Sequence, residues 1–329
     1  MNTIAFWFDN ARPVSLPQSL LPALTAVAIA SGCDSFSWSA ASLAVVGVAL
    51  AHLGMNLADD LFDYKVQSGE TRLRLAADGI RARIAKYPYL TSGKATVRQL
   101  RIAVCTLLAA SAAAGAAIAL MRGSAIAWMA IAGLFIGISY SGAPLRLGFR
   151  GMGEAIIFIM FGPLLMSGCY YAATGEMKPE IIWLSSAAGL LVTNIVYTHS
   201  VMDAAADSRI GKRTMAHVMG TPRAMIAFSA ALNTLPYALV ALGVILGQLH
   251  PAYLAAAACL PVSLWLVKSL DDFVSCRNAG IEPKPWMGPM GDFDKYRKAG
   301  IDWFMLRWLT ARNIVMFFCL IVIIVSIAV

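Results

Sequence analysis

The chain has 329 residues, of which 59% are hydrophobic and only 13% are charged, and its mean hydropathy is +0.69. This composition is too apolar for a soluble domain of that length and indicates a chain that lies in lipid. The net charge of +8 does not by itself indicate a nucleic-acid partner, because such binding needs basic residues on one solvent-exposed face. The six cysteines lie far apart, and their spacing excludes a paired zinc site or a disulfide framework.

Apolar runs long enough to cross a hydrocarbon core of about 30 Å recur along the whole chain. In chain order, we expect membrane-spanning helices near residues 15–31, 38–58, 100–121, 124–141, 152–172, 181–202, 221–246, 252–270 and 309–328. The sequence therefore predicts an all-α, polytopic membrane protein that forms a single domain over residues 1–329, with about nine transmembrane helices.

The basic residues predict an orientation in the membrane. If the N-terminus is cytoplasmic, every Lys and Arg except Arg122 and Lys178 falls on the cytoplasmic side. This bias is typical of multi-pass membrane proteins and explains most of the positive charge. We expect cytoplasmic loops near residues 64–99, 203–220 and 271–308, and the sequence suggests no function for the last of them.

An acidic cluster closes the second predicted helix, in the run Asn-Leu-Ala-Asp-Asp-Leu-Phe-Asp-Tyr-Lys at residues 56–65. Asn56, Asp60 and Asp63 are spaced i, i+4, i+7, so they share one helical face. Ionisable side chains at the ends of membrane helices are costly unless function or pairing retains them. This face is therefore a candidate functional site.

A second acidic cluster closes the sixth predicted helix, where Asp203 and Asp207 are again spaced i, i+4. Basic residues follow directly, at Arg209, Lys212 and Arg213. By the predicted topology, both acidic clusters end on the cytoplasmic side. Two such clusters on the same side favour a shared function over two unrelated helix caps.

Carboxylates at this spacing repel one another, so a cation is expected between them. Mg²⁺ prefers carboxylate and phosphate oxygens and usually keeps several waters, which suits it to bridge a protein and a diphosphate. The two acidic faces would hold two or more ions around one diphosphate, with Lys65, Arg209 and Lys212 on the remaining phosphate oxygens. His52 and His199 precede the clusters by about one turn, and such histidines are more often packing residues than metal ligands.

These motifs resemble the paired signatures of the UbiA superfamily of intramembrane aromatic prenyltransferases. The similarity extends over about residues 11–245, and includes Ala-Arg-Pro at 11–13, Tyr-Ser-Gly-Ala-Pro-Leu-Arg at 140–146 and the glycine-containing stretch at 151–163. The resemblance implies a helical bundle around a central cavity, capped by cytoplasmic loops, and a magnesium-dependent prenyltransferase. It also implies a polyprenyl diphosphate and an aromatic acceptor as partners within the lipid bilayer.

Individual residue roles also follow from the resemblance. The implied catalytic residues are Asp60, Asp63, Asp203 and Asp207. The implied Mg²⁺ ligands are these four carboxylates with Asn56, and Asp59 as a possible substitute. The implied substrate-binding residues are Asn56, Lys65, Lys94, Tyr140, Ser141, Arg146, Arg209 and Lys212. The chain departs from the family at His199, where Asn is frequent, and at Glu70, where relatives commonly have Asp.

The Gly-x-Gly-Glu stretch at 151–154 and the Tyr-Ser turn favour the branch that prenylates 1,4-dihydroxy-2-naphthoate in menaquinone biosynthesis. A 4-hydroxybenzoate acceptor or another quinone precursor is the alternative. A secondary transporter would also carry acidic residues in membrane helices, but near the midplane and beside broken helices. A phosphotransferase of the CDP-alcohol type would carry its aspartates in one compact run, which is missing here. We expect a bacterial inner membrane, and the sequence indicates no nucleic-acid or protein partner.

Overall fold

The computed structural model describes residues 3–66, 87–209, 211–277 and 282–329. In these ranges the chain is helical and forms no sheet. The long helices, in chain order, are α2 (Pro17–Ala30), α3 (Trp38–Val66), α6 (Val97–Arg122), α7 (Ala125–Ser141), α8 (Gly153–Ile159) continued by α9 (Leu165–Thr174), α10 (Pro179–Met202), α13 (Pro222–Ile245), α14 (Leu260–Val274) and α16 (Asp302–Ala328). Short helices lie between them at α1 (Thr3–Asn10), α5 (Pro88–Thr91), α11 (Ala204–Arg209), α12 (Met215–Met219) and α15 (Phe293–Lys298).

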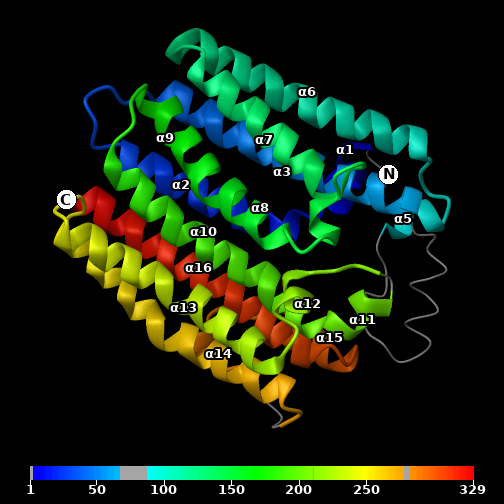
Figure 1. The fold of residues 1–329 in the computed structure, drawn as a ribbon. Coiled ribbons are helices and arrows are strands. Elements are labelled where there is room, and N and C mark those ends of the chain that lie inside the picture. Colours follow the sequence, from blue (N-terminus) through cyan, green and yellow to red (C-terminus); the bar gives the residue numbers. More distant parts are fainter. Residues whose placement is uncertain (1–2, 67–86, 210, 278–281) are drawn as a thin grey trace.

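The long helices run side by side, alternate in direction and form one elongated bundle (Figure 1). Within the described residues, seven helical stretches are long and apolar enough to cross a membrane, and α2 and α7 are shorter apolar helices. Each of the predicted spans coincides with one of these helices, which confirms the all-α membrane fold. The exact number of crossings stays a prediction. The two chain termini lie at opposite ends of the bundle, as an odd number of crossings requires (Figure 1).

The helix ends differ most from the prediction where polar residues continue a helix. Helix α3 extends to Val66 instead of ending near residue 58, so that Asp59, Asp60 and Asp63 are all helical. Helix α16 begins at Asp302, about two turns before residue 309. Hydropathy marks only the apolar part of a helix, whereas the hydrogen-bonded backbone continues beyond it.

Local sequence explains several helix starts. The Thr96 side chain caps α6 by accepting a hydrogen bond from the backbone N–H of Gln99. The Gln99 side chain accepts a hydrogen bond from the backbone N–H of Thr96 in return. Helices α10 and α13 begin with proline, whose missing N–H costs nothing at the first helical position. The predicted loops at 203–220 and 271–308 thus contain short helices, while residues 67–86 of the loop at 64–99 lie outside the described part.

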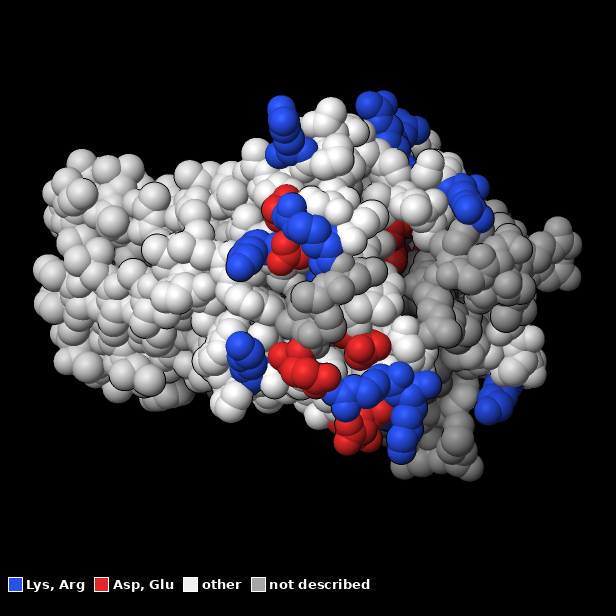
Figure 2. Space-filling view, turned by 90° about the horizontal axis from the view of Figure 1, so that it is seen from below, with Lys and Arg blue, Asp and Glu red and all other residues white. Residues whose placement is uncertain are grey.

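Two apolar clusters hold the bundle together. The larger cluster is built around α10, which packs against α2, α13 and α16. The smaller cluster joins α3 to α6 and to the aromatic residues of α1 and α5. The two clusters meet along the side of α3 that faces α9. Charged side chains gather at one end of the molecule, and the opposite end is free of them in the view of Figure 2.

The backbones of the α8–α9 helix and α10 approach each other closely. A π-helical turn at Met160–Leu164, which contains Pro163, joins α8 to α9. A Cβ atom added at Gly162 would lie 2.6 Å from the Gly189 Cα atom and 2.6 Å from the Ser185 carbonyl oxygen. Both obstacles are backbone atoms, so the crossing depends on glycine at this position.

We predict that Gly162→Ala lowers the free energy of unfolding by about 1–3 kcal/mol, because the added methyl group forces the two backbones apart. Denaturant titration in detergent micelles measures the change. Gly168→Ala is the matched control, since a Cβ atom there meets nothing within 4 Å and alanine favours the helix. Equal stability of the two variants would contradict the assigned contact.

Candidate active site

Four of the predicted carboxylates are buried at the charged end of the bundle. The exposed fraction is 3% for Asp60, 6% for Asp63, and 7% for both Asp203 and Asp207. Asp60 and Asp63 belong to α3, whereas Asp203 follows the last residue of α10 and Asp207 lies in α11. Helices α3 and α10 run in the same direction and finish at the same end of the bundle (Figure 1). Ionised carboxylates are buried at large cost unless cations or hydrogen-bond donors compensate them. Their partners therefore define the site.

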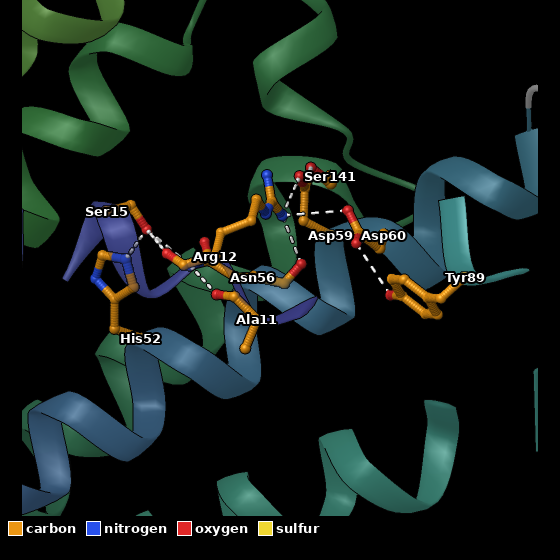
Figure 3. Close-up of polar contacts among 9 residues, drawn as sticks. All are labelled: Ala11, Arg12, Ser15, His52, Asn56, Asp59, Asp60, Tyr89 and Ser141. Atoms are coloured by element: carbon orange, nitrogen blue, oxygen red, sulfur yellow. Dashed lines mark hydrogen bonds and ion pairs between the residues drawn. The ribbon is translucent and has the colours of Figure 1, made fainter. Parts of the chain in front are cut away.

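Arg12 is a cation that contacts the first acidic set (Figure 3). Its Nη2 atom lies 2.6 Å from the Asn56 carbonyl oxygen, 3.2 Å from Asp59 Oδ2 and 3.3 Å from Asp60 Oδ1. The Arg12 backbone is left-handed, with φ at 60°, which turns the side chain from the segment after α1 toward α3. Burial alone would lower the Arg12 pKa, but the charges of Asp59 and Asp60 outweigh it and raise that pKa.

Hydrogen bonds fix the N-terminal segment onto α3. The Asn56 side-chain nitrogen donates to the Ala11 carbonyl at 2.9 Å and to Ser15 Oγ at 3.0 Å. Ser15 Oγ also lies 2.9 Å from His52 Nε2 (Figure 3). Asn56 therefore contacts the N-terminal segment through its amide group, and its predicted role as an Mg²⁺ ligand stays a prediction.

Tyr89 of α5 donates a hydrogen bond of 3.0 Å from its hydroxyl to Asp60 Oδ2 (Figure 3). Burial, and then the neighbouring charge of Asp60, raise the Tyr89 pKa above its usual range. The phenol therefore keeps its proton at neutral pH and remains a donor. Phe6 and Trp7 of α1 pack edge-on against the Tyr89 ring, at 6.1 and 5.8 Å between centroids.

The second acidic set has its own basic partners. His199 Nε2 lies 2.6 Å from Asp203 Oδ2, one turn further along α10. Lys212 Nζ lies 3.5 Å from Asp207 Oδ2. The Asp207 amide donates to the Asp203 carbonyl at 2.8 Å, so the predicted i, i+4 relation is present across the junction of α10 and α11. His199, where the resemblance leads one to expect Asn, therefore contacts Asp203, one of the predicted metal ligands.

Residues 141–150, which we call the bridging segment, contact the first acidic set and the basic residues beside the second. Ser141 Oγ, at its start, donates a short hydrogen bond to Asp59 Oδ1. Near its end, the Phe149 carbonyl accepts a hydrogen bond of 3.2 Å from the Arg213 amide. Lys212, the partner of Asp207, has its Nζ atom 6.0 Å from the centre of the Phe149 ring. One loop therefore links the ends of α3 and of α10–α11.

The remaining predicted substrate-binding residues take different positions. The Arg146 guanidinium lies 4.2 Å above the Phe149 ring within the bridging segment. Tyr140 packs over the backbone of that segment. Arg209 and Lys94 are exposed, and Lys94 lines a surface cleft between α1 and α5 rather than the acidic sets. Lys65 belongs to α3, but its side chain and residue Glu70 lie outside the described part.

The carboxylate oxygens of these sets are the hard donors that Mg²⁺ prefers, so the donor chemistry fits this ion. Among the described residues, however, no three His, Cys, Asp or Glu side chains are grouped closely enough to hold a metal. Arg12, His199 and Lys212 lie beside the same carboxylates. The predicted metal ligands, including Asp59 with its Arg12 and Ser141 contacts, remain a prediction.

Comparison with known proteins decides the family. The model of the UbiA prenyltransferase family matches residues 19–273, well over half of the chain. The chain belongs to the UbiA prenyltransferase family. It is therefore an integral membrane protein of that family, and the resemblance expected from its motifs is confirmed.

Several UbiA-family relatives share a name. The 1,4-dihydroxy-2-naphthoate octaprenyltransferase of Mycobacterium tuberculosis is 29% identical over 242 residues, which cover 70% of this chain and 76% of the relative. The protein of the same name from Haemophilus influenzae is 23% identical over 295 residues, which cover 87% of this chain and 91% of the relative. These relatives support prenyl transfer but not, at such identity, one particular acceptor.

Solved structures of UbiA-family proteins share the fold. A digeranylgeranylglyceryl phosphate synthase aligns over all of both chains with a TM-score of 0.66 and 14% identity. A UbiA homologue from Archaeoglobus fulgidus, solved with GPP and Mg²⁺, aligns over 98% of this chain and 99% of its own with a TM-score of 0.59 and 18% identity. The similarity extends to the C-terminal helices, beyond the region in which sequence motifs were found.

Two contacts of this UbiA-family site were not expected from its motifs. Arg12 belongs to the Ala-Arg-Pro motif, but its contact with Asp59 and Asp60 joins residues almost fifty positions apart. Tyr89 lies in a short helix that carries no charge signal at all. For Arg12, the available signal was a lone basic residue directly before an apolar helix.

We predict that Arg12→Met lowers the free energy of unfolding by about 1–3 kcal/mol, because it removes the guanidinium that contacts Asp59 and Asp60. Denaturant titration of the purified protein measures the loss. The control is Arg277→Met, which removes an exposed arginine from Asp271 and Asp272 at the end of α14 and should change stability little. A similar small change for both variants would contradict the buried pairing.

Proposed function

We propose that the protein transfers a polyprenyl group from an isoprenoid diphosphate to 1,4-dihydroxy-2-naphthoate, with Mg²⁺, at the cytoplasmic face of a bacterial inner membrane. The proposal is supported chiefly by two buried acidic sets at one end of the bundle, linked by the bridging segment and accompanied by cations. The relatives named as naphthoate octaprenyltransferases support prenyl transfer, and the choice of acceptor follows their name and is tested by the product assay below.

The acidic sets have the composition that a metal-bound diphosphate needs. Asp60, Asp63, Asp203 and Asp207, with Asn56, would hold the ion. When bound, Mg²⁺ would supply positive charge to the departing diphosphate oxygens. Arg and Lys donate charge-assisted hydrogen bonds to phosphate, and arginine does so through two parallel donors.

The basic side chains near the acidic sets then complete the diphosphate site. Lys212 lies between Asp207 and the Phe149 ring, and Arg146 lies on the same ring. In the proposed site, both would bind phosphate oxygens on the side of the bridging segment. Positive groups fixed in position before the reaction stabilise the charge that develops on the leaving group.

The reaction is an alkylation of an aromatic ring. The allylic carbon–oxygen bond breaks, and the diphosphate leaves with the bonding electrons. An electron-rich aromatic carbon forms the new carbon–carbon bond and then gives up a proton, which restores the ring. The apolar walls of the bundle exclude water, which would otherwise capture the allylic cation.

We predict that the purified protein, given Mg²⁺ and geranylgeranyl or a longer prenyl diphosphate, prenylates 1,4-dihydroxy-2-naphthoate and releases pyrophosphate. Mass spectrometry of the products, with 4-hydroxybenzoate as a competing acceptor, identifies the preferred substrate. Chelation by EDTA should stop the reaction and added Mg²⁺ should restore it. Product from 4-hydroxybenzoate alone would reassign the acceptor, and absence of pyrophosphate release would contradict prenyl transfer.

We predict that Asp60→Ala and Asp207→Ala each reduce turnover by at least about 100-fold, because each removes a carboxylate that would stabilise the metal and diphosphate. Membrane insertion, measured by detergent extraction and gel filtration, should be unchanged. Asp272→Ala serves as the control, since Asp272 pairs with Arg277 at the end of α14 and lies in neither acidic set. Near-normal turnover of either site variant would overturn the assignment of metal ligands.

A further inference from the structure

A small cavity lies among α2, α10 and α16, the helices that pack together at the centre of the larger apolar cluster (Figure 1). Its volume is about 200 Å³, and its lining includes Gln18 of α2, Ile195 of α10 and Arg312 of α16. Apart from Gln18 and Arg312, the lining residues are apolar. Pockets for drug-sized ligands are larger, at about 300–1,000 Å³, so this cavity suits a ligand of one or two rings.

The cavity shares α10 with the second acidic set and begins close to the segment that contacts the first. Its α2 wall begins at Pro17, two residues after Ser15, which is hydrogen-bonded to Asn56. Its α10 wall includes Ile195, one turn before His199. Eight residues separate Ile195 from Asp203, which places the cavity about 12 Å deeper along α10. A ligand here would reach toward the diphosphate site from inside the bundle.

Arg312 is a charged residue within a membrane-spanning helix, and such residues usually face a functional site or a partner. Its Nη2 atom donates to the Pro289 carbonyl and to Asn313 Oδ1, both at 3.0 Å, and its Nε atom donates to the same Asn313 oxygen at 3.3 Å. These acceptors are neutral. In the described ranges, Arg312 forms no ion pair, and its Nη1 atom makes no hydrogen bond.

Arg307, in the same helix, has a purely structural role and serves as a comparison. Its side chain is 5% exposed and donates to the Ser269 carbonyl at 3.0 Å and to the Trp303 carbonyl at 2.7 Å. Its guanidinium also lies 5.3 Å from the centre of the Phe273 ring. Arg307 therefore ties α16 to α14 and is not part of the wall of this cavity, whereas Arg312 keeps donors and an uncompensated charge beside its apolar walls.

The segment before α16 holds Arg312 in this position. Asn313 donates from its side-chain nitrogen to the Met287 carbonyl at 2.8 Å and to the Pro289 carbonyl at 3.0 Å. Gly288 lies against the same helix, because a Cβ atom there would meet the Phe317 ring at 2.7 Å. The Pro- and Gly-rich stretch of the loop at 271–308 thus has a structural role, which is to dock on α16 and orient the Arg312 side chain.

We infer that the cavity binds the aromatic acceptor and that Arg312 recognises its carboxylate. This inference rests on the proposed function, because it assigns the acceptor site of that reaction. A carboxylate accepts two parallel hydrogen bonds from a guanidinium, and the apolar walls accommodate the ring. Gln18, which lines the same cavity from α2, would supply a neutral polar contact for a ring hydroxyl.

Steady-state kinetics of the full-length protein in neutral-lipid nanodiscs tests the inference. Arg312→Met should raise KM for the aromatic acid about 10- to 100-fold, the loss of one charge-assisted hydrogen-bond pair, and leave KM for the prenyl diphosphate unchanged. Arg312→Lys should recover part of the loss because it keeps the charge. The matched control Arg307→Met should change neither KM. An unchanged KM for the acid, or an increase confined to the diphosphate, would overturn the inference.

Binding measurements separate this inference from the proposed function. In calorimetric titrations with Mg²⁺ and inorganic pyrophosphate present, 1,4-dihydroxy-2-naphthoate should bind the unaltered protein and lose affinity with Arg312→Met. The carboxylate-free 1,4-dihydroxynaphthalene should bind both proteins equally. These titrations decide the acceptor site even if no prenyl transfer occurs, in which case only the proposed function fails. No carboxylate preference, or competition by anionic phosphatidylglycerol instead of the acid, would overturn the inference.

If Arg312→Met does not fold, Gln18→Leu replaces it as the probe, because Gln18 lies on α2 and takes no part in docking the loop at 271–308. This variant should raise KM for the hydroxylated acid severalfold and leave KM for the diphosphate unchanged. An unchanged KM for the acid would then count against the assigned pocket.

Discussion

The structure depends on balancing negative charge that is buried at the end of a lipid-embedded bundle. Asp60, Asp63, Asp203 and Asp207 are almost fully enclosed by protein. Removing carboxylates from water is costly unless positive groups lie within reach. Arg12 and Lys212 meet this requirement from chain segments outside the membrane-spanning helices. The same electrostatic need that attracts these cations would attract a divalent ion together with its phosphate ligand.

The bridging segment explains how distant parts of the chain form one site. The first acidic set belongs to the smaller apolar cluster, around α3 and α6, whereas the second belongs to the larger cluster around α10. Ser141 contacts the first set, and Phe149 contacts Lys212 and Arg213 beside the second. A loop of ten residues therefore joins two separately packed halves at the point where a diphosphate would bind.

Much of the fold was accessible from sequence because hydropathy and charge bias are direct consequences of the bilayer. The spacing of Asn56, Asp60 and Asp63 likewise indicated one helical face, and the structure places them on α3. The polar ends of α3 and α16 were missed because apolar windows stop where charges begin. Arg12 was not assigned because neither its left-handed backbone nor its long-range contact with Asp60 leaves a local signal.

The segment at 271–308 shows a further limit of sequence reasoning. Its prolines and glycines indicated a loop, but not that the loop folds back onto α16 beside Arg312. This docking depends on hydrogen bonds from Asn313 to the backbone carbonyls of Met287 and Pro289. Because every residue has a backbone carbonyl, such contacts leave no signal in the sequence. Only the arrangement in space distinguishes Arg312 from Arg307, five residues earlier in the same helix.

The depth of the α2–α16 cavity below the acidic sets has an evolutionary consequence. In the proposed function, phosphate chemistry belongs to the ends of α3 and α10, while the cavity takes most of its wall from the first and last of the long helices in the chain. On that basis a duplicated gene would accumulate changes in those two helices and acquire a new product without altering the carboxylates. Diversity of products within one fold would then arise from neutral drift in two helices rather than from redesign of the whole bundle.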